Sequence, residues 1–195
     1  MTLPAIRRLA ALDEAHIFGL ARVLLDCVEG GASVSFMQPL SIERAAAFWR
    51  DVAAGVARGE RALLVAEDAS GAIVGTVQLV LAQPENQPHR ADVAKMLVHR
   101  RARRQGLAAA LMRAVEREAA LEAKSLLVLD TVTGGDAERL YERLGWQRCG
   151  VIPGYALWPN GGPCTTTVFF KALTHGPTSV RRRSRCRCAP SSRLR

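Results

Sequence analysis

The feature that most constrains the fold of this chain is a strand-like segment that runs into a basic turn and then into a helix-like segment. Residues 90–98 are rich in apolar side chains, and residues 100–105 carry four arginines. From residue 106 to about residue 123, apolar side chains such as Leu107, Leu111 and Val115 stand at helical spacing. This order predicts a helix that packs on a sheet and begins beside the end of a strand.

The rest of the chain extends this unit into one mixed α/β arrangement around a single sheet. Apolar runs rich in β-forming residues predict strands over residues 6–9, 62–67, 72–82, 125–131, 151–152 and 165–170. Helical spacing predicts helices over residues 13–27, between a capping Ser41 and Gly59, and over residues 137–144. The expected order is β-α-α-β-β-β-α-β-α-β-β, without an internal repeat.

The net charge of +9 is concentrated at the C-terminal end of the chain. Residues 174–195 hold seven arginines and no acidic residue, which leaves 20 basic and 18 acidic side chains in residues 1–173. We therefore expect a nearly neutral domain over residues 1–173 and a basic, unstructured tail over residues 174–195. Any affinity for nucleic acid would lie in that tail and not in the domain.

The cysteines and the hydropathy pattern exclude several other classes. The five cysteines form no CxxC pair with metal-ligand spacing, so we expect no metal, and Cys149 and Cys164 are predicted to be core thiols. The first eight residues lack the shape of a secretory signal, and no uncharged stretch is long enough to span a bilayer. A reduced, cytoplasmic protein is the simplest expectation.

Residues 103–108 have the composition of a turn that binds phosphate. Gly106 and Ala108 allow the backbone to approach a ligand where the helix begins, and free N–H groups there face an anion. Arg103 and Arg104 add positive charge. The segment is neither a Walker loop nor a glycine-rich dinucleotide fingerprint. A helix start that merely carries surface charge fits the same residues.

Two motifs give this chain a family resemblance. Arg103, Gly106 and Ala108 match the Q/R-x-x-G-x-G/A signature of the GCN5-related N-acetyltransferase (GNAT) family. The A-x-x-x-Y-x-x-x-G-F pattern of a later helix in that family is matched by Ala137, Tyr141, Gly145 and Trp146, with Trp in place of Phe. The resemblance covers residues 5–173. It implies a mostly antiparallel twisted sheet whose central parallel strand pair splays at the acetyl-CoA site, flanked by about four helices.

The resemblance also implies direct acetyl transfer from acetyl-CoA, the cosubstrate, to an amine. In the family the splayed strand frees an N–H group for the thioester carbonyl, whereas a fully paired core strand would fit the same residues. The residues expected to bind acetyl-CoA are Met96, Leu97, Val98, Arg103, Arg104, Gln105, Gly106, Leu107, Ala108, Ala109, Ala137 and Tyr141.

Three side chains are candidates for the chemistry. The family pattern makes Tyr141 the general acid that protonates the departing thiolate, although a packed tyrosine is the simpler reading of its apolar helix face. Asp92 and Asp130 stand on segments that are otherwise apolar, so each is a candidate to deprotonate or anchor the acceptor amine. Alternatively, Asp92 only pairs with Arg90 and Asp130 only bonds nearby backbone.

Segments outside the cofactor motif resemble the tabtoxin-resistance acetyltransferase branch, which acetylates a β-lactam amino-acid toxin. These segments are residues 30–37, 90–93, 129–131, 153–155 and 170–173. The acceptor-binding residues expected from them are Ser33, Phe36, Asp92, Asp130 and Tyr155. The chain departs from the family at residues 133–136, where Thr-Gly-Gly-Asp replaces a segment that often begins with Asn.

The sequence therefore predicts an N-acetyltransferase for a small molecule or an amino acid, with toxin detoxification as the first choice. Two alternatives stay open: acetylation of a protein or peptide amine, and a non-catalytic module that binds coenzyme A or, through the arginine tail, nucleic acid. No membrane partner is expected, and the protein is expected to be a monomer or a homodimer.

Overall fold

The computed structural model describes residues 4–173, and the order of elements in this range is the one expected from the sequence. The strands are β1 (Ala5–Leu9), β2 (Arg61–Glu67), β3 (Ile73–Val80), β4 (Arg90–Val98), β5 (Leu126–Val132), β6 (Gln147–Leu157) and β7 (Pro163–Ala172). The helices are α1 (Glu14–Glu29), α2 (Ile42–Ala57), α3 (Leu107–Leu121), α4 (Asp136–Arg143) and the short 3₁₀ helix η1 (Arg100–Ala102).

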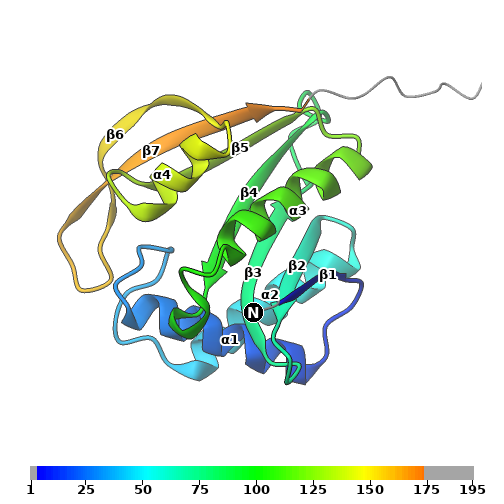
Figure 1. Ribbon diagram of the computed structural model, residues 1–195, viewed down its shortest axis with the longest axis vertical. Coiled ribbons are helices and arrows are strands. Elements are labelled where there is room, and N and C mark those ends of the chain that lie inside the picture. The colour runs from blue at the N-terminus through cyan, green and yellow to red at the C-terminus, as the bar shows by residue number, and fades with distance from the viewer. Residues whose placement is uncertain (1–3, 174–195) are drawn as a thin grey trace, which may run out of the picture.

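All of these strands belong to one twisted sheet (Figure 1). Its order is β1-β2-β3-β4-β5-β7-β6, and β4 and β5 are its parallel neighbours while the other neighbouring pairs are antiparallel. The crossover between β4 and β5 is made by η1 and α3. The expected fold class, a mixed α/β sheet with a central parallel pair and four α-helices, is confirmed.

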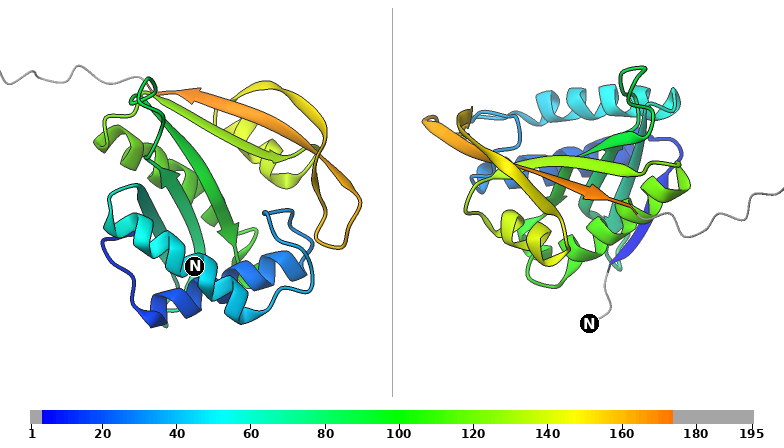
Figure 2. Two further views of the ribbon diagram at one scale, coloured as in Figure 1. Left: turned by 180° about the vertical axis from the view of Figure 1, so that it is seen from behind. Right: turned by 90° about the horizontal axis from the view of Figure 1, so that it is seen from above.

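The helices cover both faces of the sheet (Figure 2). Helices α3 and α4 pack on one face, where Leu111, Val115 and Tyr141 join a core with the sheet. Helices α1 and α2 pack on the other face around Leu24 and Trp49. The strands between them, such as β3, are buried on both faces and read as continuous apolar runs.

The parallel pair is short, and it ends halfway along β4. Residues 90–92 of β4 pair with residues 126–128 of β5, and beyond Asp92 the two strands diverge (Figure 1). Strand β4 also bulges against β3, because Lys95 and Met96 together stand opposite the single residue Val77. The splay implied by the family resemblance is therefore present.

The turn chemistry explains where several elements begin and end. The Ser41 hydroxyl accepts a hydrogen bond from the Arg44 N–H at 3.2 Å, which confirms the cap expected for α2. Strand β3 ends two residues earlier than predicted. The N–H groups of Leu81 and Ala82 donate to the Glu60 carbonyl oxygen and so leave the ladder.

Strand β6 is the largest departure from the expectation of a strand over residues 151–152. It spans eleven residues at the edge of the sheet, and almost all of them are exposed. An exposed edge strand has no apolar alternation, and it tolerates Pro153 because one side of its backbone needs no partner. Cys149 lies on this strand and is exposed, so its prediction as a core thiol was wrong, whereas Cys164 is buried as expected.

Two expectations lie partly or wholly outside the described residues. The basic tail, residues 174–195, is not described, so its predicted lack of structure and its separation from a domain over residues 1–173 stay predictions. Within residues 4–173, no helix is long and apolar enough to cross a membrane.

We predict that Gly75→Ala lowers the free energy of unfolding by about 1–3 kcal/mol, the usual cost of overpacking. A Cβ atom at Gly75 of β3 would lie 3.0 Å from Cδ1 of Leu111 and 3.2 Å from the Leu97 carbonyl oxygen. Gly75 therefore lets α3 approach the sheet. The measurement is the urea unfolding midpoint.

The matched control is Gly150→Ala on β6, where an added Cβ meets no atom within 4 Å. This variant should stay within about 0.5 kcal/mol of the parent protein. Equal destabilisation by both variants would contradict the packing argument.

Candidate active site

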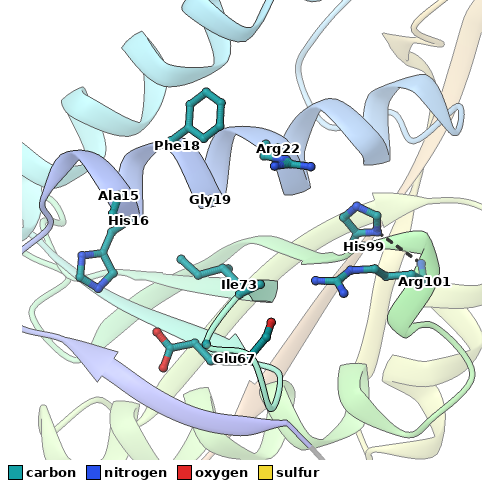
Figure 3. Close-up of a pocket in the computed structure, with 12 residues that line it drawn as sticks. Ala15, His16, Phe18, Gly19, Arg22, Glu67, Ile73, His99 and Arg101 are labelled. Atoms are coloured by element: carbon teal, nitrogen blue, oxygen red, sulfur yellow. Dashed lines mark hydrogen bonds between the residues drawn. The ribbon is translucent and has the colours of Figure 1, made fainter.

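A cavity of about 730 Å³ lies between α1 and the hairpin that joins β2 to β3 (Figure 3). It is lined by side chains such as Phe18, Arg22 and Ile73, and none of the predicted catalytic or acetyl-CoA-binding residues lines it. Arg101 at its edge pairs with Asp68 at 2.8 Å. The predicted chemistry therefore lies elsewhere, at the splayed end of β4.

The turn between β4 and α3 has the backbone of an anion site. Gly106, which precedes the helix, has a φ of 78°, and Arg104 has a φ of 60°, so two left-handed residues flank Gln105. No side chain among residues 4–173 caps α3, and its first N–H groups have no partner within the helix. Free N–H groups and the positive end of the helix dipole favour a phosphate at this position.

The two arginines of this turn differ in what they contact. The Arg103 Nε donates to the Val98 carbonyl oxygen at 3.0 Å, and its guanidinium lies 3.8 Å from Sγ of Cys27. Arg103 thus ties the turn to the end of β4 and to α1. Arg104 is exposed and forms no ion pair within residues 4–173, which leaves its charge available to a ligand. An added Cβ at Gly106 meets no atom within 4 Å, so the space in front of the helix start is open.

Strand β4 presents unpaired backbone beside this turn. Beyond Asp92 the edge of β4 that faces β5 has no strand partner in the described part of the chain, and the bulge also leaves Lys95 and Met96 out of register with β3. Leu97 and Val98 stay paired with β3 on their other side. Free N–H groups at this position are what an acetyl carbonyl oxygen requires.

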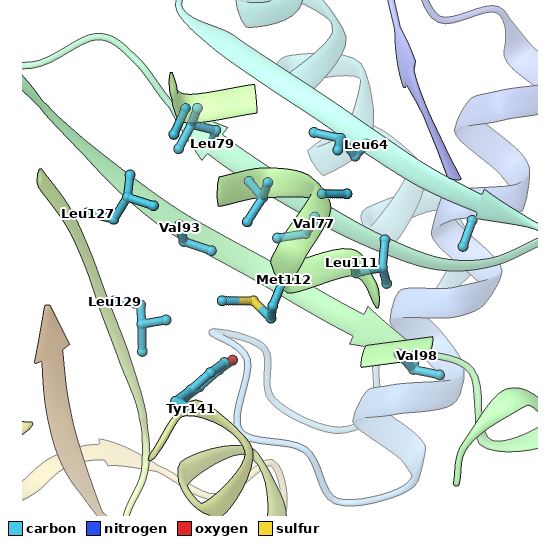
Figure 4. Packing of buried hydrophobic residues seen from close by; sticks show 14 of the residues in the cluster. Leu64, Val77, Leu79, Val93, Val98, Leu111, Met112, Leu127, Leu129 and Tyr141 are labelled. Atoms are coloured by element: carbon cyan, nitrogen blue, oxygen red, sulfur yellow. The ribbon is translucent and has the colours of Figure 1, made fainter. Parts of the chain in front are cut away.

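Tyr141 lies on α4 with its ring buried and its hydroxyl directed toward Met112 (Figure 4). The rings of Trp146 and Phe169 lie 6.1 Å from it, centroid to centroid, and fix its orientation. Burial, and secondly the negative charge of Asp130, raise the pKa of Tyr141, so the phenol keeps its proton at neutral pH.

Asp130 and Lys95 lie on the two diverging strands. Asp130 is exposed on β5 and makes no ion pair or hydrogen bond within the described part of the chain. Its charge influences the pKa of both Tyr141 and Lys95, so the structure brings these three groups into one neighbourhood. Sequence reasoning missed Lys95, because an isolated lysine on an apolar strand does not indicate a bulge.

Asp92 is held differently from Asp130. Its carboxylate forms an ion pair with Arg90, and Nε2 of Gln83 donates to it at 3.1 Å. It stands opposite Val128, where the parallel pairing of β4 and β5 ends. The ion pair with Arg90, which the sequence offered as the alternative to a role of Asp92 toward the acceptor amine, is thus present. Asp130, by contrast, has the free carboxylate.

Two of the predicted acceptor-binding residues, Ser33 and Phe36, lie in the loop between α1 and α2, residues 30–40. The Ser33 hydroxyl donates to the Leu157 carbonyl oxygen at 2.9 Å and so anchors this loop to β6. Phe36 packs edge-on against Phe48, with ring centroids 5.3 Å apart. Tyr155 projects from β6 and is 57% exposed. Ser33 therefore positions the loop, while Phe36 and Tyr155 offer apolar surface.

Hydrogen bonds to Glu138 hold the segment before α4, where the GNAT family often has Asn and this chain has none. Gly134 has a φ of 79°, and the buried Glu138 accepts hydrogen bonds from the Gly134 N–H and from the Thr167 hydroxyl. These bonds lower the pKa of Glu138, since they stabilise its charged form. Ala137 packs against the core at this helix start. An inward-facing glutamate thus fixes the loop.

In residues 4–173, no group of three or more His, Cys, Asp or Glu side chains is arranged to hold a metal ion. The residues brought together at the splayed strands are instead a backbone anion site, free strand N–H groups, a protonated phenol and a free carboxylate. These are the groups that acyl transfer to an amine requires.

Residues 59–148 match the family model of the acetyltransferase (GNAT) domain. Residues 59–148 thus resemble a GNAT acetyltransferase domain. The match covers β2 to the start of β6, and with it the splayed strand, the anion-binding turn and Tyr141. This assignment supports the expectation of an acetyl-CoA-dependent N-acetyltransferase.

Solved structures share the fold of this GNAT domain. An N-acetyltransferase from Staphylococcus aureus Mu50 is 15% identical with a TM-score of 0.72, and the match covers 89% of this chain and 100% of that one. A structure described as that of an acetyltransferase from Salmonella typhimurium, yncA, with its cofactor acetyl-CoA, is 18% identical with a TM-score of 0.72. This match covers 98% of this chain and 99% of that one. A phosphinothricin acetyltransferase from Sinorhizobium meliloti in complex with acetyl-CoA is 15% identical with a TM-score of 0.71. This match covers 90% of this chain and 91% of that one.

We predict that Gly106→Ala weakens acetyl-CoA binding about tenfold, equivalent to about 1.4 kcal/mol. The left-handed backbone at Gly106 disfavours an L side chain, so the turn must shift away from the geometry that aims its N–H groups. The measurement is the dissociation constant from isothermal titration.

Gly59→Ala is the matched control, since Gly59 also has a positive φ, 71°, and open space around it, but follows α2. It should cost similar stability and leave the affinity for acetyl-CoA unchanged. If Gly106→Ala and Gly59→Ala bound acetyl-CoA with equal affinity, the turn would not be the phosphate-binding site.

Proposed function

We propose that this GNAT domain transfers the acetyl group of acetyl-CoA directly to the amine of a small molecule or amino acid. The observation that carries the proposal is the convergence of Tyr141 and Asp130 at the point where β4 leaves β5. The turn before α3 lies at the end of the same strand. The proposed phosphate-binding turn and the proposed reaction site thus both adjoin β4.

Each residue has one role in this proposal. Acetyl-CoA supplies the acetyl thioester, and the turn at residues 103–109 holds its phosphates. Asp130 removes a proton from the acceptor ammonium, and the freed amine nitrogen bonds to the thioester carbonyl carbon. The free N–H groups of β4 donate to the carbonyl oxygen as negative charge develops. When the carbon–sulfur bond breaks, Tyr141 gives its proton to the sulfur, and the phenolate so formed takes back the proton that the nitrogen must lose to become an amide.

Two observations favour a small acceptor. The loop at residues 30–40 is tied to β6 through Ser33, and the Gln38 N–H donates to the Pro159 carbonyl oxygen at 2.8 Å. A loop held in this way narrows the approach for a polypeptide. The Sinorhizobium meliloti relative of this fold is named for a small-molecule acceptor, phosphinothricin. Within this class, the resemblance of residues 30–37 and 153–155 supports a β-lactam toxin of the tabtoxin type as the first acceptor to test.

The first experiment measures thiol release from acetyl-CoA with a panel of acceptors: the β-lactam toxin, simple amino acids, polyamines and short peptides. We predict release with the toxin or an amino acid, and a fall of at least tenfold in kcat for Tyr141→Phe, since general acid catalysis contributes about 10²–10⁴. The dissociation constant for acetyl-CoA should stay within about twofold, because the phenol acts on the leaving group.

The other outcomes decide between the alternatives. Release only with peptides would favour a protein acetyltransferase. Release with another small amine would support acetyltransferase activity and exclude the toxin as the acceptor. Acetyl-CoA binding without release on any acceptor would contradict the proposed function and favour a non-catalytic module.

A second prediction separates the two aspartates. Asp130→Asn should lower kcat/KM at least tenfold at neutral pH, because its carboxylate has no other partner within residues 4–173. Asp92→Asn should lower it less than threefold, because Asp92 is already paired with Arg90 and Gln83. Steady-state kinetics on the best acceptor of the panel measure both. The reverse order would assign the base to Asp92.

A further inference from the structure

Lys95 occupies an unusual position at the bulge of β4. Its φ is 48°, a left-handed conformation that costs a residue other than glycine stability. Its side chain is partly buried, its Nζ lies 3.1 Å from the Ser35 hydroxyl, and the ammonium lies 5.7 Å from the centre of the Phe48 ring. The lysine therefore crosses from the strand to the loop at residues 30–40 and to α2.

The loop residue that meets Lys95 has the same kind of backbone. Ser35 has a φ of 75°, so a hydrogen bond joins two of the four non-glycine residues with positive φ found in residues 4–173. Unfavourable backbone persists where the surrounding structure requires it, and such positions concentrate at functional sites. The contact is therefore held in place against the preference of both residues.

The charge of Lys95 is not neutralised by any contact in the described part of the chain. No carboxylate lies within 4 Å of its Nζ, and burial lowers its pKa while the more distant Asp130 opposes that effect. Arg61 adds a second positive charge nearby, and it donates to Oε1 of Gln78 at 3.0 Å and to no acid. Lys95 and Asp130 thus face the splay as opposite charges that influence each other without touching.

We propose that Lys95 and the Ser35 hydroxyl bind the carboxylate of an amino-acid acceptor whose ammonium lies at Asp130. This inference rests on the proposed function and specifies its acceptor as a zwitterion. The carboxylate would accept hydrogen bonds from the Lys95 ammonium and the Ser35 hydroxyl, and such charge-assisted bonds are stronger than neutral ones. A neutral group in the same place would leave a partly buried ammonium without a counter-charge.

Lys95 also lies beside the backbone that receives the acetyl carbonyl. The bulge contains both Lys95 and Met96, and the free N–H groups of the splayed strand follow directly. A carboxylate held by Lys95 therefore places the amine of the same small molecule near the thioester. Lys95 acts in this arrangement as a specificity-determining residue, and Asp130 and Tyr141 retain the proton transfers.

The test compares amino acids with their amides, which keep the ammonium and lose the carboxylate. L-alanine, L-serine and L-methionine and the three corresponding amides are titrated into the protein saturated with coenzyme A. We expect the parent protein to bind at least one amino acid about tenfold or more tightly than its amide. The same preference should appear in KM when acetyl-CoA is supplied.

Lys95→Met should abolish this preference by weakening amino-acid binding at least tenfold, with amide binding unchanged. Because the buried charge disfavours the folded state at neutral pH, this variant should unfold at a temperature no lower than that of the parent protein. Ser35→Gly removes the hydroxyl while glycine accepts the positive φ, and it should weaken amino-acid binding about threefold to tenfold. Arg113→Met, on the exposed face of α3, is the control and should change neither ligand.

Three results would overturn the proposal: equal binding of amino acids and amides by the parent protein, an unchanged preference in Lys95→Met, or an equal loss of both ligands in Lys95→Met. The proposed function fails separately, if no amine is acetylated. In that case the titrations with coenzyme A still report whether Lys95 selects a carboxylate. If the acceptors are amines without a carboxylate, the enzyme stands and the assignment of Lys95 is wrong.

Discussion

The rest of the active site depends on the early end of the pairing between β4 and β5. A sheet gains most when neighbouring strands pair along their full length, yet here the parallel pair stops at Asp92 and Val128. The bulge opposite Val77 bends β4 at the same place. One strand thereby carries free N–H groups, a partly buried lysine and, at its end, the turn that begins α3. Under the proposed function, strands that paired further would leave the acetyl group without a backbone donor.

Contacts on both sides of the sheet hold this open strand in place. On one side Gly75, which pairs with Val98 at the splayed end of β4, allows Leu111 of α3 to approach closely, so the helix stays fixed on that end of the sheet. On the other side the Asp26 carboxylate of α1 accepts from the Arg100 backbone N–H at 2.7 Å and from its Nε at 2.8 Å. These bonds, together with the Arg100 charge, lower the pKa of Asp26 against the effect of its partial burial. The segment that leads into the proposed phosphate-binding turn is thus attached to α1.

The sequence predicts the parts of this protein that depend on local periodicity, capping and glycine. It predicts the order of elements, the cap at Ser41, the basic turn and the tyrosine on α4, because each follows from neighbouring residues. It predicts only residues 151–152 of β6, since an exposed edge strand with Pro153 and two glycines carries no alternation. The position of the splay is also absent from local pattern. It depends on the register between strands more than 30 residues apart, and only the family resemblance indicated it.

Lys95 shows why a site residue escapes such reasoning and yet follows from the structure. Between Ala94 and Met96, a lysine on a regular strand would point to one face or the other, and solvent would be the simplest place for its charge. The bulge changes its direction and buries its stem against Phe48, so the ammonium meets Ser35 from a loop about 60 residues earlier. The fold thus keeps a partly desolvated cation and two left-handed residues that reduce its stability. An anionic ligand would offset that cost, because the ammonium would gain the counter-charge that the described part of the chain does not provide.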